Sequence, residues 1–178
     1  MSDETRQQLP AEDRYADELA FLEAWDPGAR PPGWRLTPRA AVAFIVGSDQ
    51  KLTADGRKLQ ISEKYVGDRG LVERCVVTLA GERGLLLVGE PGTAKSMLSE
   101  LLAAAISGSS ALTVQGTAGS NEEQLRYGWN YALLIAQGPT PDALVASPVL
   151  TAMRTGAIAR VEEVTRCLPE VQDALVSI

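Results

Sequence analysis

The feature that most constrains this chain is a glycine-containing loop between an apolar run and a helical pattern. The stretch from Gly84 to Ser96 reads Gly-Leu-Leu-Leu-Val-Gly-Glu-Pro-Gly-Thr-Ala-Lys-Ser. It follows the pattern G-x-x-x-x-G-K-[ST], with Ala94 in place of the second glycine. In such a loop, backbone N–H groups at a helix N-terminus point toward one anion. The stretch therefore predicts a loop that binds nucleotide phosphates.

Each residue type in this loop has a role in holding phosphate. Gly89 and Gly92 allow a tight turn and a close approach of the backbone. Lys95 would place its ammonium on the β- and γ-phosphates of ATP, and the Ser96 hydroxyl would ligate Mg²⁺. The methyl group of Ala94 fits if this residue has helical φ and ψ angles. The residues expected to contact the nucleotide here are Gly89, Glu90, Pro91, Gly92, Thr93, Ala94, Lys95, Ser96 and Met97.

The alternative is an ordinary glycine-rich turn between a strand and a helix, because a match of this length also occurs by chance. The flanking residues favour the phosphate interpretation. Residues 84–88 form a short apolar run that is typical of a strand, and the residues after the loop show helical periodicity that ends at Gly108. The apolar positions of this amphipathic helix are Leu98, Leu101, Leu102 and Ala105.

Composition limits the other kinds of site that the chain can hold. Hydrophobic residues make up 45% of its 178 residues and charged residues 22%, as in one soluble domain with a small appendage. No apolar run reaches the length of a membrane span, and no secretory signal opens the chain. The chain has no histidine, which removes the commonest general base and metal ligand. Cys75 and Cys167 lack metal-ligand spacing and are expected to be buried free thiols in a reducing cytoplasm.

The negative charge is concentrated at the N-terminus. Residues 1–26 hold eight acidic residues and two arginines, which equals the whole net charge of −6. The remainder holds fifteen acidic and fifteen basic residues and is neutral. Neither part has the basic stripe of a nucleic-acid-binding protein. We therefore expect neither nucleic acid nor a membrane as a partner.

Proline and glycine divide the N-terminal part of the chain. Residues 1–9 are polar and expected to be disordered. Residues 10–25 place apolar side chains on one helical face, which either docks on a partner or packs against its own domain. The Pro- and Gly-rich stretch 26–35 is typical of a linker.

Capping residues predict several further helices. Thr37-Pro38 is typical of an N-cap followed by a first-turn proline, and this helix is expected to stop at Gly47. Asp68 is expected to cap a second helix, and Ser147-Pro148 to open a third. Pro169 is expected to begin a final helix that continues to the last residue.

Shorter segments are expected to be extended or turning. Asp55-Gly56 is a turn candidate within the polar residues 48–60. Residues 111–115 and 157–161 are typical of short buried strands. Alternating aromatic residues in 127–136 indicate an extended segment or a hairpin arm.

An acidic pair follows the last of these strands. A phosphate-binding loop needs an acidic partner at the end of a neighbouring strand to hold Mg²⁺ and to activate water. Glu162 and Glu163 stand where this pair is expected. Glu162 would assist Mg²⁺ through a water, and Glu163 would act as the base. The alternative is a solvated pair of carboxylates at the start of a helix.

These motifs resemble a known family. Residues 89–96 look like the Walker A loop of AAA+ ATPases in the MoxR branch, where alanine before the lysine is usual. Residues 162–175 resemble the Walker B strand end and the following helix of that branch. The segment Tyr65-Val66-Gly67-Asp68 resembles the segment that contacts adenine in AAA+ proteins, so Val66 and Gly67 are expected to bind the base.

The resemblance implies a fold and an assembly. The fold is an α/β P-loop NTPase core of the ASCE, AAA+ type, in three layers with a central parallel sheet. The assembly is a homo-oligomeric ring, a hexamer, with ATP at the subunit interfaces. The implied activity is chaperone-like remodelling of protein partners, often von Willebrand factor A domain proteins. The expected parts are an acidic helix and linker at 1–36, a helix and connector at 37–60, and the core at 61–178.

The chain departs from the family in two respects. The usual Walker B aspartate is replaced by Glu162, which puts direct metal contact in doubt. The chain also ends before the places where the family has its sensor 1 strand, arginine finger and helical lid. We therefore expect an incomplete core, with three of the usual parallel strands, at 84–88, 111–115 and 157–161.

The sequence leads to one functional prediction with two alternatives. The prediction is a MoxR-like ATPase module that binds Mg-ATP and hydrolyses it by in-line attack of water, with Glu163 and Lys95 as catalytic residues. The first alternative is a nucleotide-binding scaffold that does not hydrolyse ATP. The second is a dynein-related, nucleic-acid-linked motor subunit, against which the neutral core argues.

Overall fold

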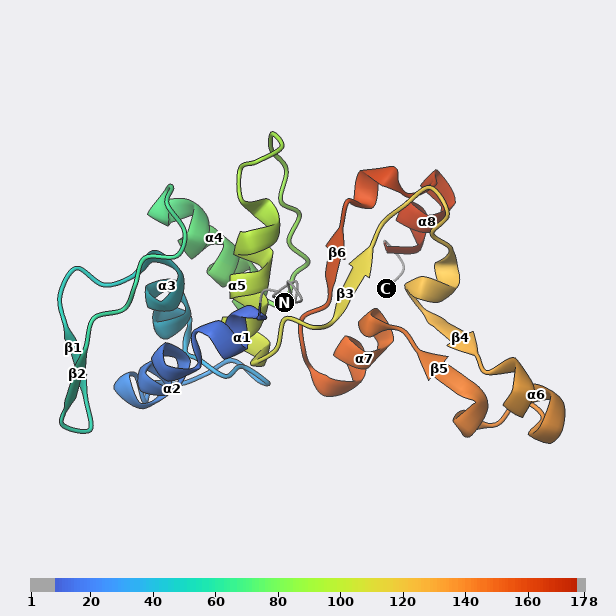
Figure 1. Cartoon of the computed structure of the whole chain (residues 1–178), viewed down its shortest axis with the longest axis horizontal. Coiled ribbons are helices and arrows are strands. Elements are labelled where there is room, and N and C mark those ends of the chain that lie inside the picture. The colour runs from blue at the N-terminus through green and yellow to red at the C-terminus, as the bar shows by residue number, and fades with distance from the viewer. Residues whose placement is uncertain (1–8, 176–178) are drawn as a thin grey trace, which may run out of the picture. The chain divides into compact units, whose positions relative to one another are not determined.

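The structure is a computed structural model that describes residues 9–175 (Figure 1). The chain divides into two compact units, one ending at Ser110 and one beginning at Ala111. The expected disorder of residues 1–9 falls almost wholly outside the described residues. The last three residues of the expected C-terminal helix also fall outside them.

The first unit consists of helices and one hairpin. The helix expected over residues 10–25 is present, but it is divided at Tyr15, whose φ and ψ are −118° and 26°. The Thr37 hydroxyl accepts a hydrogen bond from Ala40 N–H at 3.1 Å and begins the next helix, as predicted. The elements are α1 (Ala11–Arg14), α2 (Ala16–Trp25), α3 (Pro38–Val46), β1 (Leu52–Ala54), β2 (Arg57–Leu59), α4 (Arg69–Ala80) and α5 (Lys95–Ser107).

The core of the first unit lies around α3, which packs against α2, α4 and α5. Leu19, Phe21 and Leu22 on α2 are buried, so the N-terminal helix packs within its own unit. This observation decides between the two interpretations of residues 10–25. Other buried side chains of this core are Phe44, Ile45, Val72, Leu98, Leu101, Leu102 and Ile106.

The polar residues 48–60 contain a hairpin that the sequence did not predict. β1 and β2 pair antiparallel, with Leu52 opposite Leu59. The expected turn at Asp55-Gly56 joins them, and both residues have positive φ, at 48° and 76°. A two-residue loop with positive φ at both positions matches the twist of the flanking strands.

The strand expected at residues 84–88 is not formed, and this prediction is wrong. The segment has no regular secondary structure, and the side chains of Leu86 and Val88 are 73% and 85% exposed. Its composition is that of a buried strand, but a strand exists only where a neighbour supplies hydrogen bonds. Among residues 9–175, the three sheets do not include this segment.

The second unit contains a parallel strand pair and an antiparallel hairpin. The parallel pair joins residues 113–115 to residues 160–162, with Val114 opposite Val161. This pair is the parallel sheet of the described residues, two of the three strands expected for the core. The elements are β3 (Thr113–Gln115), η1 (Glu122–Gln124), β4 (Tyr127–Trp129), α6 (Tyr131–Gln137), η2 (Pro141–Ala143), β5 (Leu144–Ala146), α7 (Pro148–Thr155), β6 (Arg160–Glu162), η3 (Val164–Arg166) and α8 (Pro169–Ala174).

Residues 127–136 are extended only in their first half. β4 pairs antiparallel with β5, which confirms the hairpin arm. The segment then turns at Asn130, whose side chain accepts a hydrogen bond from Leu133 N–H at 3.3 Å and caps α6. Because the alternating aromatic residues favoured an extended segment, the cap at Asn130 and the helix after it were not predicted.

The core of the second unit is small. Its buried members come from β3, α7 and α8, together with Leu125 and with Cys167, which follows η3. The predicted cap Ser147 links this core to α7, because its hydroxyl accepts from Leu150 N–H at 2.9 Å and donates to Leu125 O at 2.7 Å. The members are Val114, Leu125, Val149, Cys167, Val171 and Ala174.

The two cysteines are buried free thiols, as predicted. Burial raises the pKa of the Cys75 thiol above its usual range. Within residues 9–175, every helix is too short or too polar to cross a membrane.

Candidate active site

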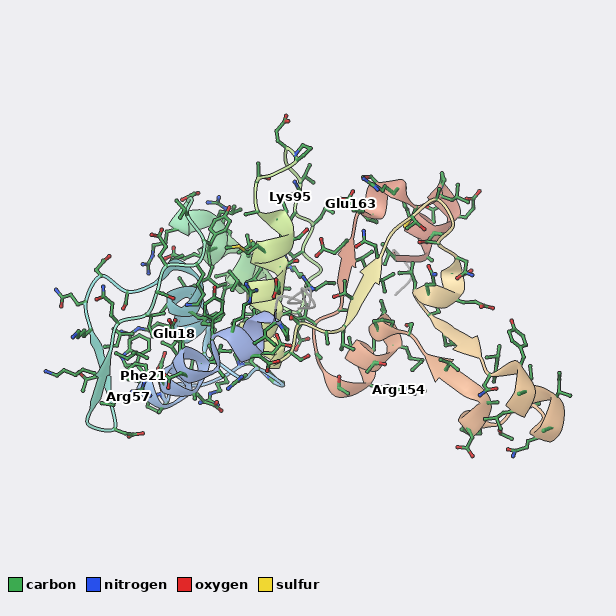
Figure 2. The ribbon with its side chains drawn as sticks, in the orientation of Figure 1. Glu18, Phe21, Arg57, Lys95, Arg154 and Glu163 are labelled. Carbon is green, nitrogen blue, oxygen red and sulfur yellow. The ribbon has the colours of Figure 1, made fainter. Side chains whose placement is uncertain are left out.

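The side chain of Lys95, the first residue of α5, bends back onto the predicted phosphate loop (Figure 2 labels Lys95). The Lys95 ammonium donates to the carbonyl oxygens of Gly89 and Glu90, at 2.8 and 2.6 Å, and lies 3.3 Å from Thr93 Oγ1. The Thr93 hydroxyl in turn donates to Glu90 O at 2.8 Å. The loop thus holds its one cation at the N-terminus of a 13-residue helix. A helix N-terminus with a lysine is a binding site for phosphate groups.

Ala94 has a left-handed backbone conformation, with φ 56° and ψ 26°. Its methyl group was expected to fit if the residue had helical φ and ψ angles, and the observed angles lie in the left-handed helical region. The left-handed region brings Cβ close to the following carbonyl and costs about 1–2 kcal/mol for a residue other than glycine. This strain explains why the motif usually has glycine at this position.

Replacing Ala94 by glycine is expected to stabilise the first unit. Removal of the left-handed strain favours the variant, and the greater chain entropy of glycine offsets about half of this gain. The free energy of unfolding should rise by up to about 1 kcal/mol in urea titrations.

Ala20→Gly is the matched control, because Ala20 is exposed within the right-handed helix α2. This variant should lose about 1 kcal/mol. A loss of similar size in Ala94→Gly would contradict the left-handed assignment.

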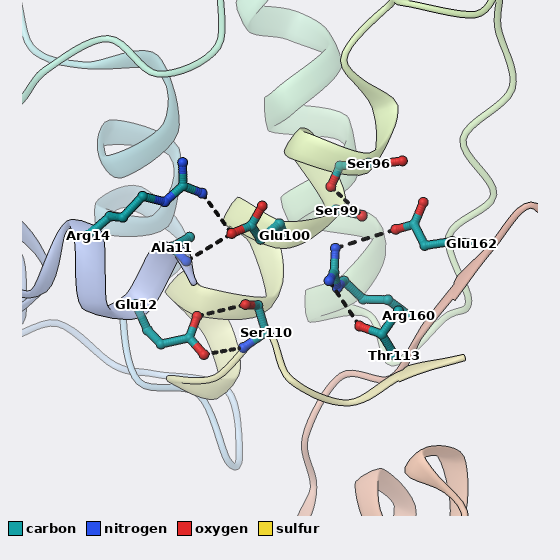
Figure 3. Close-up of polar contacts among 10 residues, drawn as sticks. All are labelled: Ala11, Glu12, Arg14, Ser96, Ser99, Glu100, Ser110, Thr113, Arg160 and Glu162. Carbon is teal, nitrogen blue, oxygen red and sulfur yellow. Dashed lines mark hydrogen bonds and ion pairs between the residues drawn. The ribbon is translucent and has the colours of Figure 1, made fainter. Parts of the chain in front are cut away.

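Ser96 and Met97 lie in the exposed first turn of α5. The Ser96 carbonyl accepts a hydrogen bond from the Ser99 hydroxyl at 2.8 Å (Figure 3). The Ser96 side chain supplies a hydroxyl oxygen directly after the lysine, the kind of ligand that Mg²⁺ takes in proteins.

The segment expected to contact the base precedes α4. Val66 exposes 86% of its surface, an unusual degree for an apolar side chain. Gly67 lies against the ring of Tyr65, and a Cβ there would come within 2.7 Å of Tyr65 Cε1. Asp68 then caps α4 by accepting a hydrogen bond from Gly70 N–H at 2.8 Å, as predicted. The segment therefore presents an exposed apolar side chain next to a glycine that lies beside the ring of Tyr65.

The acidic pair lies in the second unit, at the end of β6. The strand ends at Glu162, and Glu163 has φ 53° and ψ 39°, so the backbone turns between the two carboxylates. This turn is what the assignment of different roles to the two residues requires, because neighbouring side chains on a continuing strand point to opposite faces. The Glu162 side chain is 18% exposed and that of Glu163 52% exposed.

Each glutamate has an arginine partner, and sequence reasoning missed both arginines. Arg160 Nη1 lies 3.4 Å from Glu162 Oε1, and the same guanidinium donates to Thr113 Oγ1 at 2.9 Å (Figure 3). Arg166 Nε lies 3.2 Å from Glu163 Oε2. The available signal was spacing, since residues two apart share one face of a strand and residues three apart share one face of a helical turn.

Gly116 fixes the position of this turn. Its N–H donates to Glu162 O at 2.8 Å, immediately after the parallel pairing of β3 with β6. A Cβ on Gly116 would come within 2.6 Å of Glu163 O and 2.8 Å of Cys167 Sγ. A side chain at this position would displace the backbone that carries both glutamates.

Two of the predicted site residues have a strained backbone. Four described residues other than glycine have positive φ, and two of them are Ala94 and Glu163. Strained backbone of this kind is often found at functional sites, where the surrounding structure maintains it. The other two of the four are Asp55 and Glu82, which lie outside the predicted site, so the strain is consistent with the site but not specific to it.

Ser96 and Glu162 each offer an oxygen ligand of the kind that binds magnesium, but two protein ligands are fewer than the ion coordinates. Ser96 offers a hydroxyl and Glu162 a carboxylate, both oxygen ligands. Within residues 9–175, no group of three or more His, Cys, Asp or Glu side chains is arranged to hold a metal ion. Mg²⁺ usually completes its coordination with water and substrate phosphates and takes only one or two ligands from the protein.

The predicted residues are distributed over both units. The loop residues 89–97, together with Val66 and Gly67, belong to the first unit. Glu162 and Glu163 belong to the second. Each half of the candidate site thus has a local scaffold of its own, α5 for the loop and the β3–β6 pair for the glutamates.

Comparisons with known proteins show the family to which the chain belongs. The profile of the AAA domain family (dynein-related subfamily) matches residues 84–178. The chain is 54% identical over 169 residues to the Escherichia coli (strain K12) protein "Uncharacterized protein YehL", a match that covers 95% of this chain and 44% of that relative. No solved structure matches the chain.

The matched residues begin at the apolar run before the phosphate loop and extend through the acidic pair, so they include residues 89–97, Glu162 and Glu163 but not Val66 and Gly67. This confirms the AAA+ resemblance and the P-loop NTPase fold class that follows from it. The chain belongs to the AAA domain family, dynein-related subfamily.

Proposed function

We propose that this chain is the nucleotide-binding part of a MoxR-like AAA+ ATPase that binds Mg-ATP and hydrolyses it. As a member of the AAA family, the chain is a nucleotide-binding ATPase module. The observation that carries the proposal is the loop around Lys95, in which two carbonyls and a threonine hydroxyl surround one ammonium at the start of α5. An ammonium held in this way can exchange these neutral acceptors for the anionic oxygens of a triphosphate.

The remaining residues have separate roles in the proposed reaction. Lys95 would neutralise charge that develops on the β- and γ-phosphates. Ser96 and Glu162 would hold Mg²⁺, which supplies further charge neutralisation when bound. Glu163 would accept a proton from the attacking water, and the nearby Arg166 orients its carboxylate. Val66 and Gly67 would contact the base.

A second candidate function is nucleotide binding without hydrolysis. The ion pairs of Glu162 and Glu163 favour it, because an arginine neutralises each carboxylate. A carboxylate that is hydrogen-bonded to a guanidinium is less available to a metal ion or to a water molecule. A protein with this scaffold function would bind nucleotide through the phosphate loop but would not hydrolyse it.

The whole protein's activity is part of the proposal. The chain spans less than half the length of the curated relative that it matches. We infer a homo-oligomeric ring, a hexamer, with ATP at its subunit interfaces, that remodels protein partners in the cytoplasm in the manner of a chaperone. Von Willebrand factor A domain proteins are the partners that the MoxR-like resemblance favours.

The test is calorimetric titration of the chain with ATP, with and without Mg²⁺, followed by phosphate release from the full-length protein. We expect binding that tightens when Mg²⁺ is present, and slow release of phosphate. Failure to bind ATP would reject the phosphate loop. Binding without any phosphate release would favour the scaffold function.

A further inference from the structure

Lys64, which immediately precedes the base-contacting segment, is a buried cation. Its side chain is 1% exposed. The ammonium donates hydrogen bonds to Glu18 Oε2, to Phe44 O at 2.8 Å and to Ser62 O at 3.0 Å. It also lies over the rings of Phe44 and Tyr15, at 4.4 and 4.7 Å from their centroids. A buried ammonium with one charged partner depends on that partner, since an unpaired buried charge is strongly destabilising.

The contacts of Lys64 fix where the base-contacting segment begins. The backbone N–H groups of Lys64 and Tyr65 both lie 3.1 Å from Ile45 O, and the Lys64 ammonium bonds the preceding carbonyl of Phe44. Side chain and backbone together therefore attach this point of the chain to the C-terminal end of α3. A Cβ added to Gly67 would lie 2.7 Å from Tyr65 Cε1, so the Tyr65 ring lies beside Gly67, two residues beyond this attachment.

Glu18 reaches Lys64 from α2, and the N-terminal residues also contact the helix that carries the phosphate loop. Glu100 on α5 accepts hydrogen bonds from Ala11 N–H at 2.8 Å and from Arg14 Nη2 at 2.7 Å (Figure 3). Glu12 accepts from the N–H and hydroxyl of Ser110, at 2.8 and 2.7 Å. Residues 11–18 therefore connect α5 to the start of the base-contacting segment.

The charge of Glu18 is required for this connection. Burial lowers the pKa of Lys64, whereas the hydrogen bond and charge of Glu18 raise it. Besides Glu18, the groups that face the ammonium are the rings of Tyr15 and Phe44 and two backbone carbonyls. Without the carboxylate, the ammonium is expected to move toward water and to take the start of the segment with it.

We propose that the Glu18–Lys64 pair is a positioning device for the base-contacting segment 65–67, by which the N-terminal helix sets how tightly the chain holds the base of its nucleotide. This inference rests on the proposed ATP binding and on the base contact assigned to Val66 and Gly67. It assigns a role in nucleotide binding to the acidic N-terminal residues, which belong neither to the phosphate loop nor to the acidic pair. Lys64 and Glu18 touch no nucleotide and act through the segment.

The test compares two probes on the whole chain, ATP and inorganic triphosphate. Glu18→Gln is expected to weaken ATP binding about fivefold or more, the lower end of typical coupling between sites, and to leave triphosphate binding unchanged. A purely structural role would lower both affinities together, because triphosphate requires only the folded loop around Lys95. The ratio of the two affinities, measured by calorimetry, is therefore the decisive quantity.

Two further variants complete the test. Lys64→Met keeps the aliphatic stem between the aromatic rings and leaves no buried charge, so it should fold and show the same selective loss of ATP affinity. Asp17→Asn is the matched control on the same helix (Figure 2 labels the adjacent Glu18 and the partner Arg57). Asp17 pairs with Arg57 at the exposed surface, at 2.8 Å between Oδ1 and Nη1, and its loss should change neither affinity.

The outcomes separate this inference from the function on which it rests. A wild-type chain that binds neither probe would reject the proposed function and the inference with it. A wild-type chain that prefers ATP to triphosphate, with Glu18→Gln and Lys64→Met showing the same preference, would overturn the inference alone. If both variants lose affinity for ATP and for triphosphate to the same extent, the inference is also overturned, because the pair would then only maintain the fold.

Discussion

Replacing Lys95 by alanine is expected to weaken ATP binding about tenfold or more. Its ammonium is the only cation within the loop of residues 89–96, and a charge-assisted hydrogen bond contributes about 1.5–3 kcal/mol. A difference of about 1.4 kcal/mol corresponds to a tenfold change in affinity. The measurement is calorimetric titration with ATP in the presence of Mg²⁺.

The control for this variant is Lys58→Ala, which removes an exposed lysine from β2 in the same unit. It should bind ATP like the wild type. Circular dichroism of Lys95→Ala is needed as well, because Lys95 bonds two carbonyls of its own loop. Equal ATP affinity in Lys95→Ala and wild type would reject the assignment of the phosphate loop.

Replacing Glu163 by glutamine is expected to abolish most ATP turnover while ATP affinity stays nearly intact. The amide keeps the shape of the side chain but cannot accept a proton, and a general base contributes about 10²–10⁴ in rate. The experiment measures phosphate release by the full-length protein, together with nucleotide binding. The backbone turn at Glu163 allows this residue to act differently from Glu162.

Two other glutamates serve as comparisons. Glu162→Gln should raise the Mg²⁺ concentration needed for ATP binding, since its carboxylate is assigned to the metal. Glu170→Gln removes an exposed carboxylate from the first turn of α8 and should leave turnover unchanged. If Glu163→Gln hydrolyses ATP at the wild-type rate, Glu163 is not the base and the pair is only a charged turn.

The elements that the sequence predicted well are those with local causes. The caps at Thr37, Asp68 and Ser147 were predicted correctly because a capping side chain bonds a backbone N–H two or three residues away. The end of α5 at Gly108 was equally predictable, since the left-handed conformation there favours glycine. Such interactions form between residues within one helical turn of each other and hardly depend on the rest of the chain.

The features that the sequence did not reveal concern partners distant in sequence or exact backbone angles. Residues 84–88 have the composition of a strand, but a strand requires a neighbour that no local pattern reveals. Ala94 fits the motif in sequence, yet its left-handed conformation is a property of the folded loop. The burial of Lys64 could not be predicted from local sequence, because its partner Glu18 lies 46 residues away.

The sequence suggests which residues form the candidate site, and this stays a prediction, but it does not reveal what surrounds them. The motifs identified Lys95, Glu162 and Glu163 because each chemistry demands a particular residue type at a particular spacing. The arginines that pair with the two glutamates belong to no motif. Gly116 was likewise missed, since its constraint comes from the backbone of β6, which approaches it in space.

The attachment of the N-terminal residues bears on how this protein can be shortened or tagged for expression. A designer who follows the motifs would begin a minimal chain at residue 61 and discard the acidic helices as an appendage. Such a chain would retain Lys64 and Glu100 but lose Glu18 and Arg14, leaving an ammonium and a carboxylate without their counter-charges. It would also uncover the apolar surface that Leu19 and Leu22 cover. Cloning boundaries should therefore fall before Pro10, whose carbonyl begins the hydrogen bonding of α1.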